Sequence, residues 1–378
     1  MTTIVGVVGI ITGLNRYVQE KIIILAPDMY IVTRFGIIRS REEFIQAVKR
    51  PQLTWEEYQR ISSGVLSHAA LTATRSFKTL PVNNGDHRLA DTFIVGATAS
   101  WAGVLNLDTE GNGRLFTEGE DQSAQNVAVI GADIKEELFP NQDPIGRTMM
   151  IRGLPFRVIG QMLKEGKGLG VNRDQLVIIP FQVYRKNFFA PGDPLDYFIK
   201  ARGGVEGLEA SIDETRAFLR ALRHTSWRDP DPVGFLTQDQ LQELWRQIST
   251  ATFVLLTLIA SVSLGVGGIV IMNIMLVSVA ERTQEIGVRM ALGAFKRDIR
   301  RQFLLEAALL SLAGGVIGVV LGGTTALLVK TFTGFPAQIT VGIVLMGVGL
   351  STLVGLLAGF LPARRAANLP VIDALRAE

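Results

Sequence analysis

Three long runs without a charged residue occupy most of the C-terminal third of the sequence, and they restrict what the chain can fold into. The runs are residues 248–280, 307–329 and 331–363. A helix needs about 20 apolar residues to cross roughly 30 Å of hydrocarbon, so each run is long enough to span a bilayer. Each is therefore predicted to be a transmembrane helix. The amphipathic residues 238–247 precede the first run, and we expect them to extend that helix as a stalk.

The N-terminus carries a shorter apolar segment, residues 1–15. It is too short to span a bilayer, and it lacks the basic stretch and small-residue cleavage site of a signal peptide. We expect it to be the outer part of a first transmembrane helix whose beginning lies outside this chain. A short buried or interfacial helix at a true N-terminus is the alternative.

Between these apolar segments lies a polar stretch, residues 16–247, whose length fits one or two globular subdomains. Thr54 and Glu57 have the spacing of a helix capping box, and residues 205–222 have the pattern of an amphipathic helix. Short β-branched segments typical of strands are residues 93–95, 127–130, 156–159 and 176–179. The mixture predicts an α+β domain of two subdomains.

Composition excludes several kinds of site. Of the 378 residues, 48% are hydrophobic and 19% are charged, which is typical of a membrane protein with a substantial water-soluble part. There is no cysteine, so disulfides, thiolate metal sites and cysteine nucleophiles are excluded. A net charge of only +3 does not indicate a nucleic-acid partner.

The sequence also lacks the motifs of common catalytic centres. It has no G-x-x-x-x-G-K-[ST] phosphate loop and no G-x-S-x-G nucleophile elbow. Its three histidines do not have the spacing of metal ligands. The glycine-rich residues 166–170 are not followed by an apolar helix, which favours a flexible loop. No catalytic, cofactor or metal site is therefore predicted on this chain.

Basic residues indicate the orientation in the membrane. They gather in residues 281–306 and in the tail 364–378, whereas the link between the last two runs carries only Lys330. Short loops rich in lysine and arginine remain in the cytoplasm. The loop 281–306 and the tail are therefore predicted to be cytoplasmic, and the domain 16–247 is predicted to lie on the outer side, in an α-helical membrane protein of four transmembrane helices.

The loop 281–306 contains a second amphipathic pattern. Ile286, Met290 and Ala294 recur every four residues, and Glu285 precedes Arg289 by four. The pattern predicts a short helix over residues 284–292 that ends at Gly293. Such a helix beneath a membrane can dock in a groove on a partner, although the same charges would also be explained by topology alone.

At the inner edge of the next run, Glu306 is expected to reach the interface or to pair with Arg301 or Gln302. Small residues recur every four positions in the last two runs and form flat faces for close helix contacts. Packing within one subunit and packing between two copies are both open. These small residues are Gly314, Gly318, Gly322, Gly347, Ser351, Gly355 and Gly359.

The string ERTQEIGVRMALGA, residues 281–294, closely resembles the loop after the second transmembrane helix in MacB-like and FtsX-like permeases of ABC transporters. Residues 113–162 and 362–378 are similar to the family's periplasmic core domain and to its usual ending. The resemblance implies contact between this loop and an ATPase subunit. The coupling residues that it implies are Glu281, Arg282, Glu285, Ile286, Gly287, Arg289, Leu292 and Gly293.

The same resemblance implies a non-catalytic permease in a bacterial inner membrane. A separate ABC ATPase would hold ATP and Mg, the permease would form a homodimer, and a periplasmic adaptor is a further expected partner. ATP binding and hydrolysis would change the conformation of the outer domain and export a substrate such as an antimicrobial, a peptide or a lipid.

Three other classes share part of this pattern. A lipoprotein-releasing permease has the same topology but would carry a lipoprotein-binding hook, which is not recognisable here. An FtsX-type regulator of cell-wall hydrolases typically has a smaller outer domain. A membrane-anchored hydrolase would need a nucleophile or a metal-ligand cluster that the sequence does not show.

Overall fold

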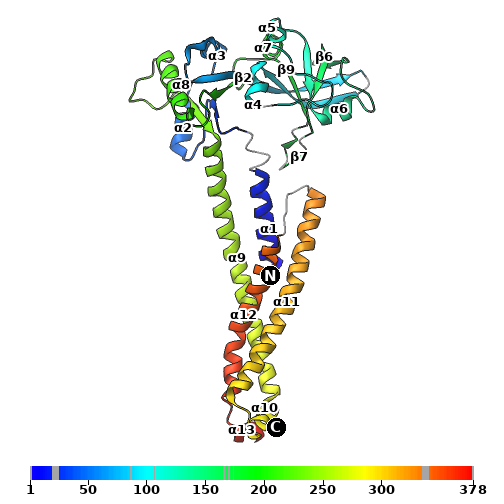
Figure 1. Ribbon diagram of the computed structural model, residues 1–378, viewed down its shortest axis with the longest axis vertical. Helices are drawn as coiled ribbons and strands as arrows, with labels where there is room; N and C mark the ends of the chain where they lie inside the picture. The colour runs from blue at the N-terminus through cyan, green and yellow to red at the C-terminus, as the bar shows by residue number, and fades with distance from the viewer. Residues whose placement is uncertain are drawn as a thin grey trace. The chain divides into compact units, whose positions relative to one another are not determined.

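The computed structural model describes residues 2–18, 25–85, 87–105, 107–164, 167–168, 171–172, 174–333 and 340–376. The chain divides into two compact units, shown with all their elements in Figure 1. The helical unit comprises Met1–Ile22 and Trp245–Glu378, and the outer unit comprises Ile23–Leu244.

The helical unit is built from α1 (Thr2–Tyr17), most of α9 (Gln238–Glu281), α10 (Thr283–Ala291), α11 (Lys296–Thr333), α12 (Val341–Ala367) and α13 (Val371–Arg376). Within the described residues, three helices are long and apolar enough to cross a membrane, namely α9, α11 and α12. Residues 238–247 extend the first transmembrane helix, as predicted, because α9 is one helix of 44 residues that begins at Gln238.

Two boundaries differ from the sequence-based expectation. Lys330 lies inside α11 and not in a link, because the helix continues to Thr333. At the other end, α12 includes Pro362, Arg364 and Arg365, so the helix continues four residues beyond Ala363, the last residue of the run. A proline there is tolerated when neighbouring helices compensate for the lost backbone bond. Of the expected run 331–363, residues 334–339 lie outside the described residues.

Small residues bring α11 and α12 close together. A Cβ atom built on Gly355 would lie 2.0 Å from Ser311 Oγ, and one on Gly359 would lie 2.4 Å from Ala307 Cβ. The Ser351 hydroxyl donates to the Ser311 carbonyl oxygen at 2.8 Å. The small-residue face of α12 therefore packs within the chain. Gly314, by contrast, has no atom within 4 Å of such a Cβ.

The outer unit contains a nine-stranded mixed sheet with the strand order β11-β1-β10-β2-β3-β9-β4-β6-β5. Strand β2 also pairs with β5, so β2, β3, β9, β4, β6 and β5 form a closed ring. Only β3–β9 and β4–β6 are parallel among these described pairs. The strands are β1 (Met29–Thr33), β2 (Ala69–Asn84), β3 (His87–Ala97), β4 (Val127–Ile130), β5 (Thr148–Ile151), β6 (Leu154–Gln161), β9 (Leu176–Pro180), β10 (Asp196–Ala201) and β11 (Gly234–Thr237).

All four predicted strand segments lie within β3, β4, β6 and β9, so the expected α+β character is confirmed. The turn between β5 and β6 is formed by Arg152 and Gly153, both with positive φ, which is typical of a two-residue hairpin turn. Of the expected glycine-rich loop, Lys167–Gly168 forms a short strand β7 that pairs with β8 (Val171–Asn172). Residues 166, 169 and 170 of that loop lie outside the described residues.

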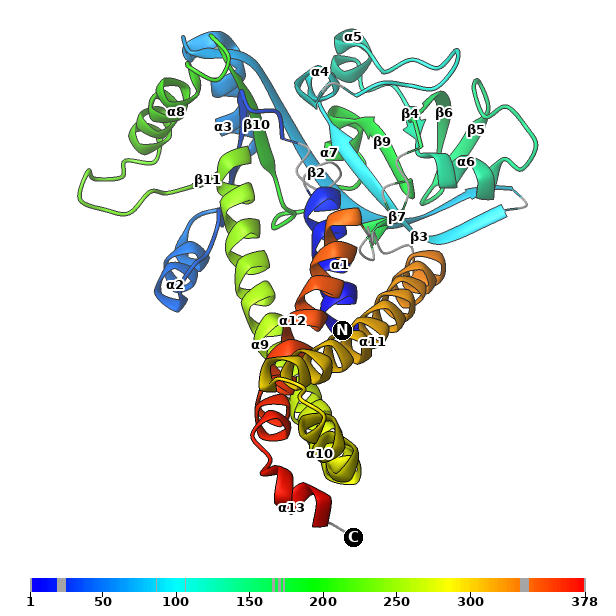
Figure 2. The same ribbon diagram turned by 60° about the horizontal axis from the view of Figure 1, so that its bottom comes forward.

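Short helices flank this sheet (Figure 2). They are α2 (Arg41–Lys49), α3 (Trp55–Arg60) with the π-turn η2 (Ile61–Val65), α4 (Ser100–Leu105), α5 (Glu118–Gln122), α6 (Ala132–Leu138), α7 (Phe181–Asn187) and α8 (Leu208–Leu222). The predicted capping box of Thr54 and Glu57 is present at α3. The N-cap of α6 is Gly131. Helix α8 begins at Leu208, three residues later than the sequence predicted, and Gly207 before it lies tightly against the Arg202 carbonyl.

The core of the outer unit is rich in aromatic side chains. Phe181 stacks on Trp55 with 4.7 Å between ring centroids, and Tyr184 and Phe156 are fully buried in the same cluster. Helix α8 is fixed to β1 because the buried Tyr30 hydroxyl lies 2.7 Å from Thr215 Oγ1. Aromatic burial is a large source of stability in a domain of this size.

Candidate functional site

The eight residues that the sequence analysis singled out form one continuous segment around α10. Glu281 is the last residue of α9, Arg282 is the N-cap of α10, and Leu292 is its C-cap. Gly293 follows with φ of 99°, a conformation that glycine adopts readily and that commonly ends a helix. The predicted short helix is thus present, shifted by one residue at each end.

The inner face of α10 is buried against three other helices. Ile286 is 1% exposed and belongs to a cluster with Val279 of α9, Phe303 of α11 and Ala363 of α12. A fully buried isoleucine contributes roughly 1.5–3 kcal/mol. Helix α10 is therefore attached to the ends of the three apolar helices and is not a free loop.

Gly287 lies where the C-terminal helix α13 packs on α10. A Cβ atom at Gly287 would lie 2.8 Å from Ala374 Cβ, a distance that real Cβ contacts essentially never show. Ala374 is 1% exposed. The sequence analysis predicted a cytoplasmic tail at residues 364–378 but neither its helix nor this contact. The sequence does contain a signal for α13. Pro370 stands directly before an apolar-polar repeat, and proline is favoured at the start of a helix.

Two ion pairs involve α10 and its N-cap. Glu285 pairs with Arg289, as the four-residue spacing predicted. Arg282 Nη1 lies 3.3 Å from Glu306 Oε1, so the expected pairing of Glu306 with Arg301 or Gln302 was wrong. Gln302 instead accepts a hydrogen bond from Arg289 Nη1 at 3.1 Å.

The reason for the different pairing is tertiary. The turn at Arg282 folds α10 back toward α11, which brings two arginines of the loop to the polar side chains of α11. Exposed pairs of this kind contribute about 0–1 kcal/mol, so they fix the direction of α10 more than they stabilise it.

Two large apolar side chains in the turn between α10 and α11 are exposed. Leu292 is 84% exposed and Phe295 is 65% exposed, and the Arg297 guanidinium lies 5.1 Å from the centroid of the Phe295 ring. Neighbouring exposed apolar side chains mark sites of protein contact in water-facing segments. Among the described residues, no group of three or more histidine, cysteine, aspartate or glutamate side chains is placed to hold a metal ion.

Comparisons with known proteins give two family matches. Residues 1–215 match the MacB-like periplasmic core domain, and residues 257–371 match the FtsX-like permease C-terminal domain. The eight residues around α10 lie within the second match, whereas Ala374 lies beyond its end.

Curated relatives resemble the chain over its whole length. It is 31% identical over 391 aligned residues to the macrolide export ATP-binding/permease protein MacB of Bdellovibrio bacteriovorus, covering 100% of this chain and 58% of that protein. It is 30% identical to the pyoverdine export ATP-binding/permease protein PvdT of Pseudomonas aeruginosa, covering 100% of this chain and 56% of that protein. The chain thus spans less than three fifths of these relatives.

A solved structure also resembles part of the chain. It is the crystal structure of the periplasmic region of MacB from Actinobacillus actinomycetemcomitans, with 14% identity and a TM-score of 0.48, and the match covers 60% of this chain and 96% of that one.

Proposed function

The chain belongs to the family of permeases that combine a MacB-like periplasmic core domain with an FtsX-like C-terminal domain, and from this membership we propose that it is the membrane-spanning permease of a MacB-type ABC transporter. ATP and Mg bind to a partner ATPase, and this chain is not itself catalytic. The observation that carries the proposal is α10 with the turn that follows it: Ile286 anchors the helix in a buried cluster, and Leu292 and Phe295 of the turn are exposed.

The coupling runs through the chain in two steps. An ATPase groove receives Leu292 and Phe295, so that movement of the ATPase displaces α10. Because Ile286 fixes α10 to the helix ends, this displacement passes into α9. Helix α9 continues for 44 residues, about 66 Å at 1.5 Å per residue, up to the residue that follows β11 of the outer unit.

Several features of the assembly belong to the same proposal. The protein lies in a bacterial inner membrane as a homodimer, with residues 281–306 and the C-terminal tail in the cytoplasm and the outer unit in the periplasm. Helix α1 is part of a fourth transmembrane helix; in support, Asn15 Oδ1 accepts hydrogen bonds from Trp245 at 2.9 Å and Ser249 at 2.7 Å, both on α9. The outer unit comprises two subdomains, one around β1, β10 and α8 and one around the closed ring of strands.

Transport of a substrate out of the cell is the proposed activity, with an antimicrobial, a peptide or a lipid as the cargo. Relatives named for macrolide export and pyoverdine export favour export over lipoprotein release or the control of cell-wall hydrolases.

The test is co-purification of ATPase activity with the tagged full chain from its native membranes. Leu292→Asp should reduce the recovered activity about tenfold or more, because a charge would enter an apolar interface. Leu163→Asp is the matched control, since Leu163 is 50% exposed and lies in the outer unit. Equal recovery with both variants would show that α10 is not the ATPase contact, and the absence of any ATPase would remove the transporter proposal.

A further inference from the structure

The outer unit contains a polar cavity of about 480 Å³ that the proposed coupling does not use. This cavity, named here the α5 cavity, is lined by side chains from α3, β2, α5 and the first turn of α7. All of its lining residues lie within the outer unit. Its volume is in the usual range of small-molecule sites.

The charge of the α5 cavity is negative. The described residues that line it include two carboxylates, Glu118 and Asp121, and no basic side chain. The two lie three residues apart on α5, so they share one face of that helix. Neither forms an ion pair within the described part of the chain. Arg185 lies 5.2 Å from the centroid of the Trp55 ring, but Arg185 does not line the cavity.

The two carboxylates differ in how they can act on a ligand. Asp121 is 3% exposed, and burial together with the charge of Glu118 raises its pKa to about 6. Its carboxylate accepts a hydrogen bond from the Gln182 backbone N–H at 3.0 Å. Glu118 is exposed and can contact a ligand directly. A cation beside Glu118 would relieve the repulsion between the two carboxylates, because it attracts both of them.

Neutral hydrogen-bonding groups surround these charges. They include the side chains of Gln59, Ser62, Gln122 and Gln182. In the described part of the chain, the side-chain amides of Gln59 and Gln182 have no hydrogen-bond partner. An amide both donates and accepts, so it suits the hydroxyl groups of a ligand. Leu71, which is 40% exposed, adds an apolar contact.

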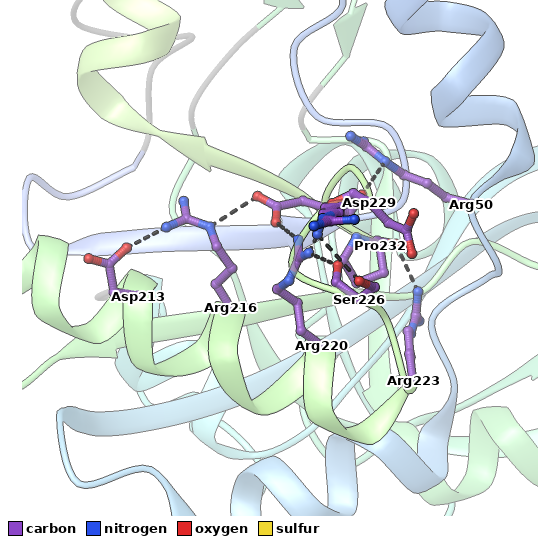
Figure 3. Close-up of polar contacts among 10 residues, drawn as sticks. Arg50, Asp213, Arg216, Arg220, Arg223, Ser226, Asp229 and Pro232 are labelled. Atoms are coloured by element: carbon purple, nitrogen blue, oxygen red, sulfur yellow. Dashed lines mark hydrogen bonds and ion pairs between the residues drawn. The ribbon is translucent and has the colours of Figure 1, made fainter.

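A second cavity of the outer unit shows a carboxylate that is already paired. This cavity of about 340 Å³ is lined in part by Arg50, Arg216 and Asp231. Arg216 Nε donates to one carboxylate oxygen of Asp231 at 3.0 Å, and Arg220 Nη1 donates to the other at 2.7 Å; Figure 3 shows these arginines. A cationic ligand would meet guanidinium groups there. Glu118 and Asp121 have no such partners in the described part of the chain.

We propose that the α5 cavity binds a small organic cation, an ammonium group on a body that carries hydroxyl groups, as in an amino sugar. The ammonium group pairs with Glu118 close to the negative charge of Asp121, and the hydroxyl groups bond to the amides of Gln59 and Gln182. Hydrogen bonds between charged groups are stronger than those between neutral groups, so the ammonium group determines the selectivity. This binding is separate from the contact of α10 with an ATPase.

A divalent metal ion fits this cavity less well than an organic cation. Calcium and magnesium ions need several oxygen ligands close together. The α5 cavity offers two carboxylates, and Asp121 already accepts a backbone hydrogen bond. A polyatomic cation needs only one close carboxylate and can use the neutral amides for the rest of its contacts.

The first experiment measures the binding of three methyl glucosides to the purified full chain in detergent at neutral pH, by saturation-transfer NMR. The three probes share one ring and carry an amine, a hydroxyl or a carboxylate on the same carbon atom. We expect the amine to bind at least about tenfold more tightly than the hydroxyl compound, and we expect no binding of the carboxylate. Equal affinities of the three probes, or no binding of the amine, would overturn the proposal.

The second experiment repeats the measurement with variants. Glu118→Gln removes a charge at nearly constant size and should weaken binding of the amine about fivefold or more. Glu137→Gln is the matched control, because Glu137 is exposed on α6 and does not line the cavity. Ala70→Trp fills the cavity from β2 without a change of charge and should weaken binding about tenfold or more.

Two results would contradict the proposed site. Equal affinities of Glu118→Gln and Glu137→Gln would show that the ammonium group does not pair with Glu118. Full binding by Ala70→Trp would place the probe outside the α5 cavity. Co-purified ATPase activity should stay unchanged in all three variants, so this proposal and the coupling proposal can fail separately.

Discussion

The helical unit and the outer unit hold their elements together in opposite ways. Where α12 lies on α11, the contact consists of Gly355, Gly359 and Ala307, with backbones so close that a single added carbon does not fit. In the outer unit the contacts are made by large rings such as Phe181 on Trp55, and by arginines that reach backbone carbonyl groups. The same chain therefore uses its smallest side chains in one region and its largest in the other.

The difference follows from the solvent that each region is built for. Between helices in hydrocarbon, burial of apolar surface gives no gain, so association depends on close van der Waals contact and small residues favour it. In water, removal of large apolar surfaces is the main driving force. Truncation of a large buried side chain should therefore destabilise the outer unit. In the helical unit, addition of even a small side chain at a glycine contact should be destabilising.

The largest effect is expected from Phe181→Ala. Phe181 is fully buried and stacks on Trp55, and truncation of a buried phenylalanine typically costs about 3–5 kcal/mol. Urea unfolding of residues 25–244 would measure the change. Phe44→Ala is the matched control, because Phe44 is 51% exposed on α2 and should cost less than about 0.5 kcal/mol. Equal losses for both variants would mean that the aromatic core does not determine the stability of this unit.

Gly355→Val should destabilise the helical unit by about 1–3 kcal/mol, since the new side chain overlaps Ser311 and forces α11 and α12 apart. Thermal unfolding of the full chain in detergent would measure it. Gly349→Val is the control, because no atom lies within 4 Å of a Cβ atom at Gly349. If both valine variants behaved like the original chain, close packing within the chain would not be what holds these two helices.

Local patterns in the sequence predicted most of the elements and few of the contacts between them. The charge-free runs predicted the three long helices, Thr54 with Glu57 predicted the start of α3, and the short β-branched segments predicted strands such as β4. Each depends on residues within a few positions of one another. The pairing of β2 with β5 joins Val82 to Ile151, and no local pattern indicates such a distant register.

In the candidate site, too, the local features were predicted and the contacts between distant segments were not. The four-residue repeat predicted α10 and the pair of Glu285 with Arg289, because both are local. The pairing of Arg282 with Glu306 and the packing of α13 on Gly287 depend on how the chain folds back, and sequence spacing does not specify that. The coupling role of the eight residues came from family resemblance and stays a prediction.

A buried carboxyl group makes the stability of the outer unit depend on pH. In the outer unit the carboxyl group of Asp121 is 3% exposed, and burial raises its pKa to about 6, although the Gln182 backbone N–H donates to it at 3.0 Å. The unfolded value is 3.8, so the folded state binds the proton more tightly. The free energy of unfolding should therefore fall as the pH rises from about 4 to 6 and level off above that range.

The expected change from this group is about 1 kcal/mol between pH 5 and pH 7, smaller than either substitution above. Glu120 and Glu214 have the opposite sign, but their pKa values of about 2 confine their contribution to lower pH. Urea unfolding of residues 25–244 at several pH values would measure the slope, and Asp121→Asn should remove it because the amide does not titrate. A slope that persists in Asp121→Asn would assign the pH dependence to another group, and the buried carboxyl would then be ionised at pH 5 despite its burial.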